Sequence, residues 1–143
     1  MMEDALPLPL QVRWLGKVRY RDALAVQESL FEARPENYLL LMEHFPVFTL
    51  GVNGDESNIL VEPSKIGAEV IRIKRGGDVT YHGPGQLVGY PILTVPGKRG
   101  GGMADTSAYV NSVEQLIIDA LGELGLPNCG RIAKYPGVWV DPN

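Results

Sequence analysis

Residues 75–86, Arg-Gly-Gly-Asp-Val-Thr-Tyr-His-Gly-Pro-Gly-Gln, constrain the local fold more than any other segment of the chain. Glycine has no Cβ atom, so it lets the backbone turn sharply or approach a ligand closely. The glycines at 76–77 and 83–85 therefore predict two tight corners around a short β-run over residues 79–81. A binding loop and a glycine-rich hairpin with incidental polar groups both fit this pattern. The side chains that can bind or catalyse are Arg75, Asp78, Thr80, His82 and Gln86.

Length and composition fit one globular domain over residues 1–143. Of the 143 residues, 45% are hydrophobic, which supports a single core. The net charge of −4 disfavours nucleic-acid binding, because nucleic-acid-binding proteins carry a basic surplus. No apolar run reaches the ~18 residues of a membrane span, and the acidic start does not resemble a signal peptide. The single cysteine, Cys129, excludes an internal disulfide. We expect a cytoplasmic protein.

Strand and helix patterns are mixed along the chain. Apolar runs predict strands over residues 11–15, 38–42, 47–50, 69–74, 87–95 and 137–140. In the strand over 69–74, we expect Val70, Ile71 and Ile73 to pack and Arg72 and Lys74 to face water. Helices are predicted over 20–31, over 61–68, where Pro63 suits a first helical turn, and from a cap at 105 or 106 to a stop at Gly125. Together these elements predict an α+β fold, with a mixed sheet flanked by helices.

Several side chains are candidates for chemistry. His44 lies between an apolar run and Pro46, so we expect a packed, hydrogen-bonded structural histidine. His82 lies among glycines and can polarise a carbonyl or transfer a proton. Arg75 keeps its proton, so it serves as an anchor or electrostatic stabiliser, or as a structural salt bridge to Asp78. We expect no metal and no cofactor, because no zinc, phosphate-loop or dinucleotide pattern occurs. Cys129, in a loop expected over residues 128–130, is interpreted as incidental rather than as a nucleophile.

The segment over residues 75–92, RGGDVTYHGPGQLVGYPI, resembles the central motif of the octanoyltransferases, also called lipoyl(octanoyl) transferases or lipoate–protein ligase B. Three other segments agree in order. They are Leu15-Gly16 with Tyr20, the EHFPVFTLG segment over 43–51, and the GVWV segment over 137–140. The resemblance covers nearly the whole chain.

This resemblance implies a fold related to the biotin and lipoate protein ligases. It implies transfer of an octanoyl group from octanoyl-acyl carrier protein, through a cysteine thioester, to a lysine of a lipoyl domain. The acceptors implied are the lipoyl domains of 2-oxoacid dehydrogenases and the glycine cleavage H protein. We expect Val79, Tyr81, Leu87 and Val88 to help form an apolar slot. The substrate-binding residues implied are Arg75, Gly76, Gly77, Asp78, Val79, Thr80, Tyr81 and His82.

The resemblance also implies a catalytic lysine in a K-x-A-x-I-G segment after residues 137–140, and a cysteine in a later P-C-G segment. Neither segment occurs here, and Lys134 and Cys129 are not their counterparts. We therefore expect no catalytic residue in this chain and expect both residues beyond Asn143, in a C-terminally truncated domain. Two alternatives stay open: a non-catalytic module that binds the acyl group or carrier protein, and an ATP-dependent lipoate or biotin ligase relative. An acidic carrier protein is a candidate partner for Lys98 and Arg99, with Lys65, Arg72 or Lys74, although ordinary solvated charges are the preferred interpretation of these residues.

Overall fold

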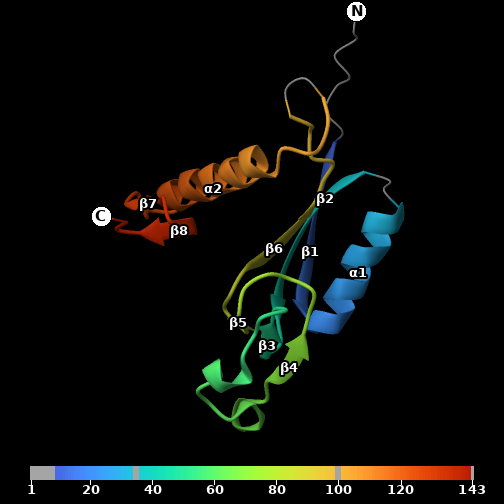
Figure 1. The fold of residues 1–143 in the computed structure, drawn as a ribbon, viewed down its shortest axis with the longest axis vertical. Coiled ribbons are helices and arrows are strands. Elements are labelled where there is room, and N and C mark those ends of the chain that lie inside the picture. Colours follow the sequence, from blue (N-terminus) through green and yellow to red (C-terminus); the bar gives the residue numbers. More distant parts are fainter. Residues whose placement is uncertain (1–8, 34–35, 99–100, 143) are drawn as a thin grey trace, which may run out of the picture. The chain divides into compact units, whose positions relative to one another are not determined.

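The computed structural model describes residues 9–33, 36–98 and 101–142. It divides into two compact units, Met1–Leu93 and Thr94–Asn143 (Figure 1). Arg99, which one sequence prediction involves, lies outside the described residues. The α+β class is confirmed. The first unit contains β1 (Leu10–Val18), α1 (Tyr20–Ala33), β2 (Asn37–His44), β3 (Val47–Leu50), the 3-10 turns Glu56–Asn58 and Pro63–Ile66, β4 (Glu69–Arg72), β5 (Val79–His82) and β6 (Val88–Ile92).

One sheet of the first unit has the strand order β1-β2-β6. It is mixed, as predicted, because β1 runs parallel to β2 while β6 runs antiparallel to it. Helix α1 lies beside this sheet (Figure 1), and its Ala23 packs against Leu40 and Met42 of β2. Burying a side chain of the size of Leu or Met stabilises the folded state by roughly 1.5–3 kcal/mol. These contacts hold α1 against the sheet.

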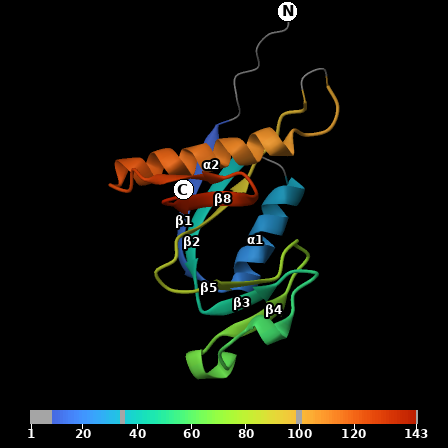
Figure 2. The ribbon, with the colours of Figure 1, turned by 60° about the vertical axis from the view of Figure 1, so that its left-hand side comes forward.

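The second sheet has the order β4-β3-β5, with β4 parallel and β5 antiparallel to the central strand β3. All four residues of β3 are buried, which explains why its sequence is continuously apolar apart from one threonine. Tyr20, at the start of α1, packs with Val47 of β3 and Ile71 of β4. This contact brings the beginning of α1 to the second sheet (Figure 2).

Three sequence predictions in this unit need correction. Val70 is 40% exposed while Ile71 is 4% exposed, because neighbouring residues of a strand point to opposite faces. Arg72 and Lys74 are exposed, as predicted. The helix expected over 61–68 is only a 3-10 turn, which Gly67 ends at a φ of 64°. The strand expected over 87–95 is limited to the residues of β6, which pair with β2.

The second unit contains α2 (Thr106–Glu123), β7 (Cys129–Ile132) and β8 (Tyr135–Val140). The helix begins as predicted, because the Asp105 side chain accepts a hydrogen bond from the Ala108 N–H at 3.1 Å. It ends at Glu123, two residues before the predicted stop at Gly125, whose φ of 93° suits glycine. The loop expected over 128–130 is wrong, because Cys129 begins β7 and pairs with Val140. Across the described residues, no helix is both long enough and apolar enough to cross a membrane.

Candidate functional site

The glycine-rich segment forms strand β5 and the turns at both of its ends. Gly77 and Gly85 have φ values of 81° and 89°, which confirms the two predicted corners. A Cβ atom on Gly51 would lie 2.3 Å from the carbonyl oxygen of Gly77, so only glycine lets the end of β3 meet this turn. Strand β5 pairs with β3, with Thr80 opposite Thr49. The register therefore brings two hydroxyl groups together.

Arg75 connects the two strands at these hydroxyls. Its Nη2 donates to the Thr49 carbonyl at 2.7 Å, to Thr49 Oγ1 at 2.9 Å and to Thr80 Oγ1 at 3.1 Å. Its Nη1 donates to the Gly76 carbonyl at 2.8 Å. These acceptors are all neutral, and the ion pairs of the described residues do not include one between Arg75 and Asp78. Arg75 therefore ties β3 to β5 through neutral acceptors.

Asp78 has a different role from the salt bridge considered for it. Its carboxylate accepts a hydrogen bond from the Asp55 N–H at 2.9 Å and another from the Asn58 side chain. Its backbone carbonyl accepts from the Gly51 N–H at 2.9 Å. Asp78 therefore ties the segment to the turn over residues 51–58.

His82 lies in a cluster of aromatic rings from four elements. Its ring stacks on Tyr20 of α1, with centroids 6.4 Å apart and an interplanar angle of 9°. It meets the His44 ring edge-on at 5.8 Å, and His44 also contacts Tyr20 at 5.3 Å and Tyr90 at 5.8 Å. Nδ1 of His82 lies 2.5 Å from Oε1 of Gln86. The cluster thus places His82 against His44, the other histidine considered from the sequence, in a group completed by tyrosines from α1 and β6.

His44 is the buried centre of this cluster, with 0% of its surface exposed. Its Nδ1 donates to the Val18 carbonyl at 2.8 Å, because a carbonyl oxygen only accepts. In the neutral ring, Nε2 then accepts from the Tyr90 hydroxyl at 2.8 Å. Burial lowers the pKa of His44, the hydrogen bond to Val18 opposes this, and the charge of His82 lowers the pKa further. The predicted structural role of His44 is confirmed.

A cavity of 730 Å³ lies beside Arg75. Its wall contains apolar side chains, such as Leu24 and Ile73, and charged ones, which are Arg21, Arg72, Lys74, Arg75 and the acidic Glu28. Of the predicted binding residues, only Arg75 lines it. Burial raises the pKa of Tyr20, which also lines the cavity, and the nearby charge of Arg75 opposes that rise.

The apolar slot expected from four side chains does not form around this cavity. Val88 instead packs against the core of Ala23, Leu40 and Met42. Leu87 is 65% exposed, and Tyr81, 42% exposed, packs on Phe48 with centroids 5.1 Å apart. Val79 is half-buried opposite Leu50 in the sheet.

The structure adds Thr49, Tyr20 and Tyr90 to the candidate site. Thr49 holds Arg75, while Tyr20 and Tyr90 contact the two histidines. No local spacing in the sequence links these residues, because they come from β3, α1 and β6. The usable signal was that all three lie in segments that carry the family resemblance: Tyr20 beside Leu15-Gly16, Thr49 within residues 43–51, and Tyr90 within residues 75–92.

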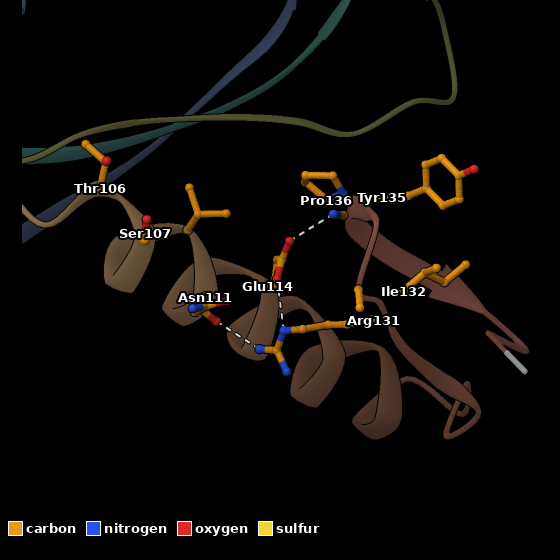
Figure 3. Close-up of a pocket in the computed structure, with 11 residues that line it drawn as sticks. Thr106, Ser107, Asn111, Glu114, Arg131, Ile132, Tyr135 and Pro136 are labelled. Atoms are coloured by element: carbon orange, nitrogen blue, oxygen red, sulfur yellow. Dashed lines mark hydrogen bonds and ion pairs between the residues drawn. The ribbon is translucent and has the colours of Figure 1, made fainter.

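The second unit has its own cavity, of 430 Å³, between α2 and the β7–β8 hairpin (Figure 3). Glu114 lines this cavity and accepts hydrogen bonds from Arg131 Nε at 2.9 Å and from the Gly137 N–H at 2.8 Å. Both carboxylate oxygens are therefore used in holding the helix to the hairpin.

Cys129 and Lys134 lie apart in this hairpin. Cys129 is half-buried and begins β7, while Lys134 is exposed in the turn that follows the other end of the strand. A cysteine nucleophile needs a neighbouring base or cation, and Lys134 is not placed to serve it. Among the described residues, no three His, Cys, Asp or Glu side chains gather in a way that could hold a metal ion.

Comparison with known proteins identifies the family. Three similar proteins are named octanoyltransferase. The one from Solibacter usitatus is 46% identical over 136 residues, covering 90% of this chain and 60% of its own length. Those from Myxococcus xanthus and Dictyoglomus thermophilum are each 44% identical; they cover 88% and 92% of this chain but 36% and 56% of their own lengths. The chain thus spans about 60% or less of these relatives.

Two solved structures share the fold. Both are of protein Ta0514 from T. acidophilum, a proposed lipoate protein ligase. One has a TM-score of 0.67 and 16% identity, and covers 90% of this chain and 57% of the other. The second, with bound lipoic acid, has a TM-score of 0.61 and 19% identity, and covers 85% of this chain and 49% of the other. A family model, the lipoyl protein ligase A/B catalytic domain, matches residues 19–143. The chain belongs to the lipoyl protein ligase A/B catalytic domain family.

Proposed function

We propose that the protein is an octanoyltransferase, with residues 1–143 contributing to one catalytic domain. The observation that carries this proposal is the 46% identity to a named octanoyltransferase over 136 residues. The proposed donor is octanoyl-acyl carrier protein, and the proposed acceptors are lysines of lipoyl domains in 2-oxoacid dehydrogenases and the glycine cleavage H protein. The proposed location of this octanoyl transfer is the cytoplasm.

The geometry supports a substrate-binding role for the segment over residues 75–82. Acyl transfer from a thioester develops negative charge on the carbonyl oxygen, and preorganised donors stabilise that charge. Arg75 supplies a cation without a carboxylate partner among the described residues, held by Thr49 and Thr80. Its cavity offers apolar wall for a hydrocarbon chain. The proposed binding set remains Arg75, Gly76, Gly77, Asp78, Val79, Thr80, Tyr81 and His82.

A second candidate is ATP-dependent ligation of free lipoate or octanoate. The family model covers both the A and the B type of lipoyl protein ligase, and the similar T. acidophilum protein is a proposed ligase. The two candidates differ in their acyl donor, because a ligase must activate a free acid with ATP and Mg²⁺.

The test uses the protein expressed from its gene, a lipoyl domain and octanoyl-acyl carrier protein, with mass spectrometry as the readout. We expect octanoylation of the lipoyl domain without ATP. Octanoylation that requires ATP and free octanoate would favour the ligase. Binding of the octanoyl-carrier protein without any transfer would instead indicate a non-catalytic module.

A further inference from the structure

We propose that Gln86 is a positioning residue: it fixes the tautomer of His82, so that Nε2 of His82 can accept a hydrogen bond from a reacting group. Only the role toward the substrate rests on the proposed function. The tautomer itself follows from hydrogen bonds within β5 and the turn after it.

The first step concerns the orientation of the Gln86 amide group. Its Nε2 donates to the backbone carbonyl of Tyr81 at 3.3 Å. A carbonyl oxygen can only accept, so the amide nitrogen must be the atom on that side. The amide oxygen Oε1 therefore faces Nδ1 of His82, at 2.5 Å.

The second step follows from this orientation. An amide oxygen carries no proton, so Nδ1 of His82 must donate the hydrogen bond. In a neutral imidazole one nitrogen carries the proton and the other carries a lone pair, and the hydrogen bond of one nitrogen decides the state of the other. Nε2 of His82 therefore carries the lone pair, and within the described residues no hydrogen bond occupies it.

The turn explains how Gln86 returns to His82, four residues earlier. The Gln86 N–H donates to the Gly83 carbonyl at 3.2 Å, and Gly85 has a φ of 89°. A Cβ atom on Gly83 would lie 2.3 Å from the Tyr81 hydroxyl, so a larger residue would displace either the ring or the turn. The glycines of the motif thus shape the turn that carries Gln86.

The neighbouring rings fix the plane of the His82 ring. Tyr20 stacks on one side with an interplanar angle of 9°, and His44 meets the ring edge-on at 5.8 Å. His44 is itself held through both nitrogens, by the Val18 carbonyl and the Tyr90 hydroxyl. Gln86 then needs to set only the position of the proton.

The tautomer decides what His82 can do for a reaction. With the proton on Nδ1, Nε2 can accept a hydrogen bond from the S–H or N–H of a reacting group. With the proton on Nε2, the same atom would offer a donor instead. Gln86 would therefore act on transfer only through His82, which makes it a positioning residue and not a catalytic one.

The direct test is ¹⁵N NMR of the two histidine side chains in the full chain, near neutral pH, with His44→Gln used to assign them. In the wild-type protein we expect the His82 proton on Nδ1. Gln86→Leu removes the acceptor, so the population with the proton on Nδ1 should fall by about half or more. Gln86→Glu keeps an acceptor oxygen and should keep the Nδ1 proton. Gln27→Leu, the same change in a side chain that bonds the Ala23 carbonyl on α1, is the matched control.

A wild-type spectrum with the proton on Nε2 would overturn the proposal, even if Gln86→Leu failed to fold. So would a folded Gln86→Leu protein with unchanged His82 signals.

The transfer rate is a second readout. We expect kcat of Gln86→Leu to fall about tenfold with KM little changed, and Gln86→Glu to recover most of the lost kcat. A changed tautomer with unchanged kcat would contradict the positioning role. If the wild-type protein showed no transfer, the proposed function would fail, while the NMR result would still decide the tautomer.

Discussion

The two units of the chain are stabilised in different ways. In Met1–Leu93, apolar side chains are buried in two clusters, one around Met42 and one around Val47. In the described part of Thr94–Asn143, the buried side chain is a glutamate, Glu114. The apolar residues of α2 are half-buried or exposed, with Leu116 at 63%, and Leu124, just after the helix, is 80% exposed.

The second unit depends on a polar centre. Glu114 accepts from Arg131 and from the Gly137 backbone, and Arg131 also donates to the Asn111 carbonyl at 2.9 Å. Charge-assisted hydrogen bonds of this kind connect α2 to both strands of the hairpin. The difference teaches that the first unit carries most of the hydrophobic stabilisation, and that the periodicity of α2 does not by itself bury a helix face.

The largest expected effect is a difference in stability loss when one side chain is truncated in each unit. Met42→Ala leaves a cavity in a fully buried position and should lower the free energy of unfolding of the first unit by about 2–5 kcal/mol. Leu116→Ala removes a mostly exposed side chain and should cost the second unit about 0.5 kcal/mol or less.

The two tryptophans allow this measurement, because Trp14 lies in β1 and Trp139 in β8. Denaturant unfolding is followed in a Trp139→Phe background for the first unit and in a Trp14→Phe background for the second. Equal losses of the free energy of unfolding from Met42→Ala and Leu116→Ala would refute the contrast between the units.

A smaller effect should appear with pH, and only in the first unit, which holds both histidines of the chain. Burial lowers the pKa of His44 below its usual 6.5 in the folded state. Below pH 6.5 the unfolded chain therefore binds a proton that folded His44 does not, so stability falls as the pH drops toward the folded pKa. Above pH 6.5 this contribution is fully present.

The groups that face His44 are Tyr20, His82 and Tyr90. Burial raises the pKa of both tyrosines, so neither titrates in this range. His44→Gln should therefore reduce the pH dependence seen by Trp14 fluorescence between about pH 5 and 6.5, while the Trp139 signal stays flat. If the stability of both units changed equally with pH, groups other than His44 would cause the pH dependence.

Local sequence signals predicted the elements of this fold better than the contacts between them. β3 was predicted at residues 47–50 because Pro46 and Gly51 delimit an apolar run. The start of α2 followed from one capping side chain. β7 was missed because Asn128-Cys129-Gly130 has loop-forming residues at both ends, and its pairing with β8 depends on residues about ten positions later.

The candidate site was predicted only in part for the same reason. The motif pointed to Arg75 and His82, which do carry the central contacts of the site. The partners that orient them, Thr49 and Tyr20, come from distant parts of the chain and only the fold brings them close.

The central claim is the proposal that the segment over residues 75–82 binds the octanoyl substrate and that His82 contributes to its transfer. The most direct measurement compares the octanoyl transfer rate of His82→Ala with that of the wild-type protein and of Gln27→Leu, once circular dichroism shows that all three are folded. We predict a loss of about tenfold or more for His82→Ala and a rate near that of the wild type for Gln27→Leu. A His82→Ala rate within about twofold of the wild type would contradict the account.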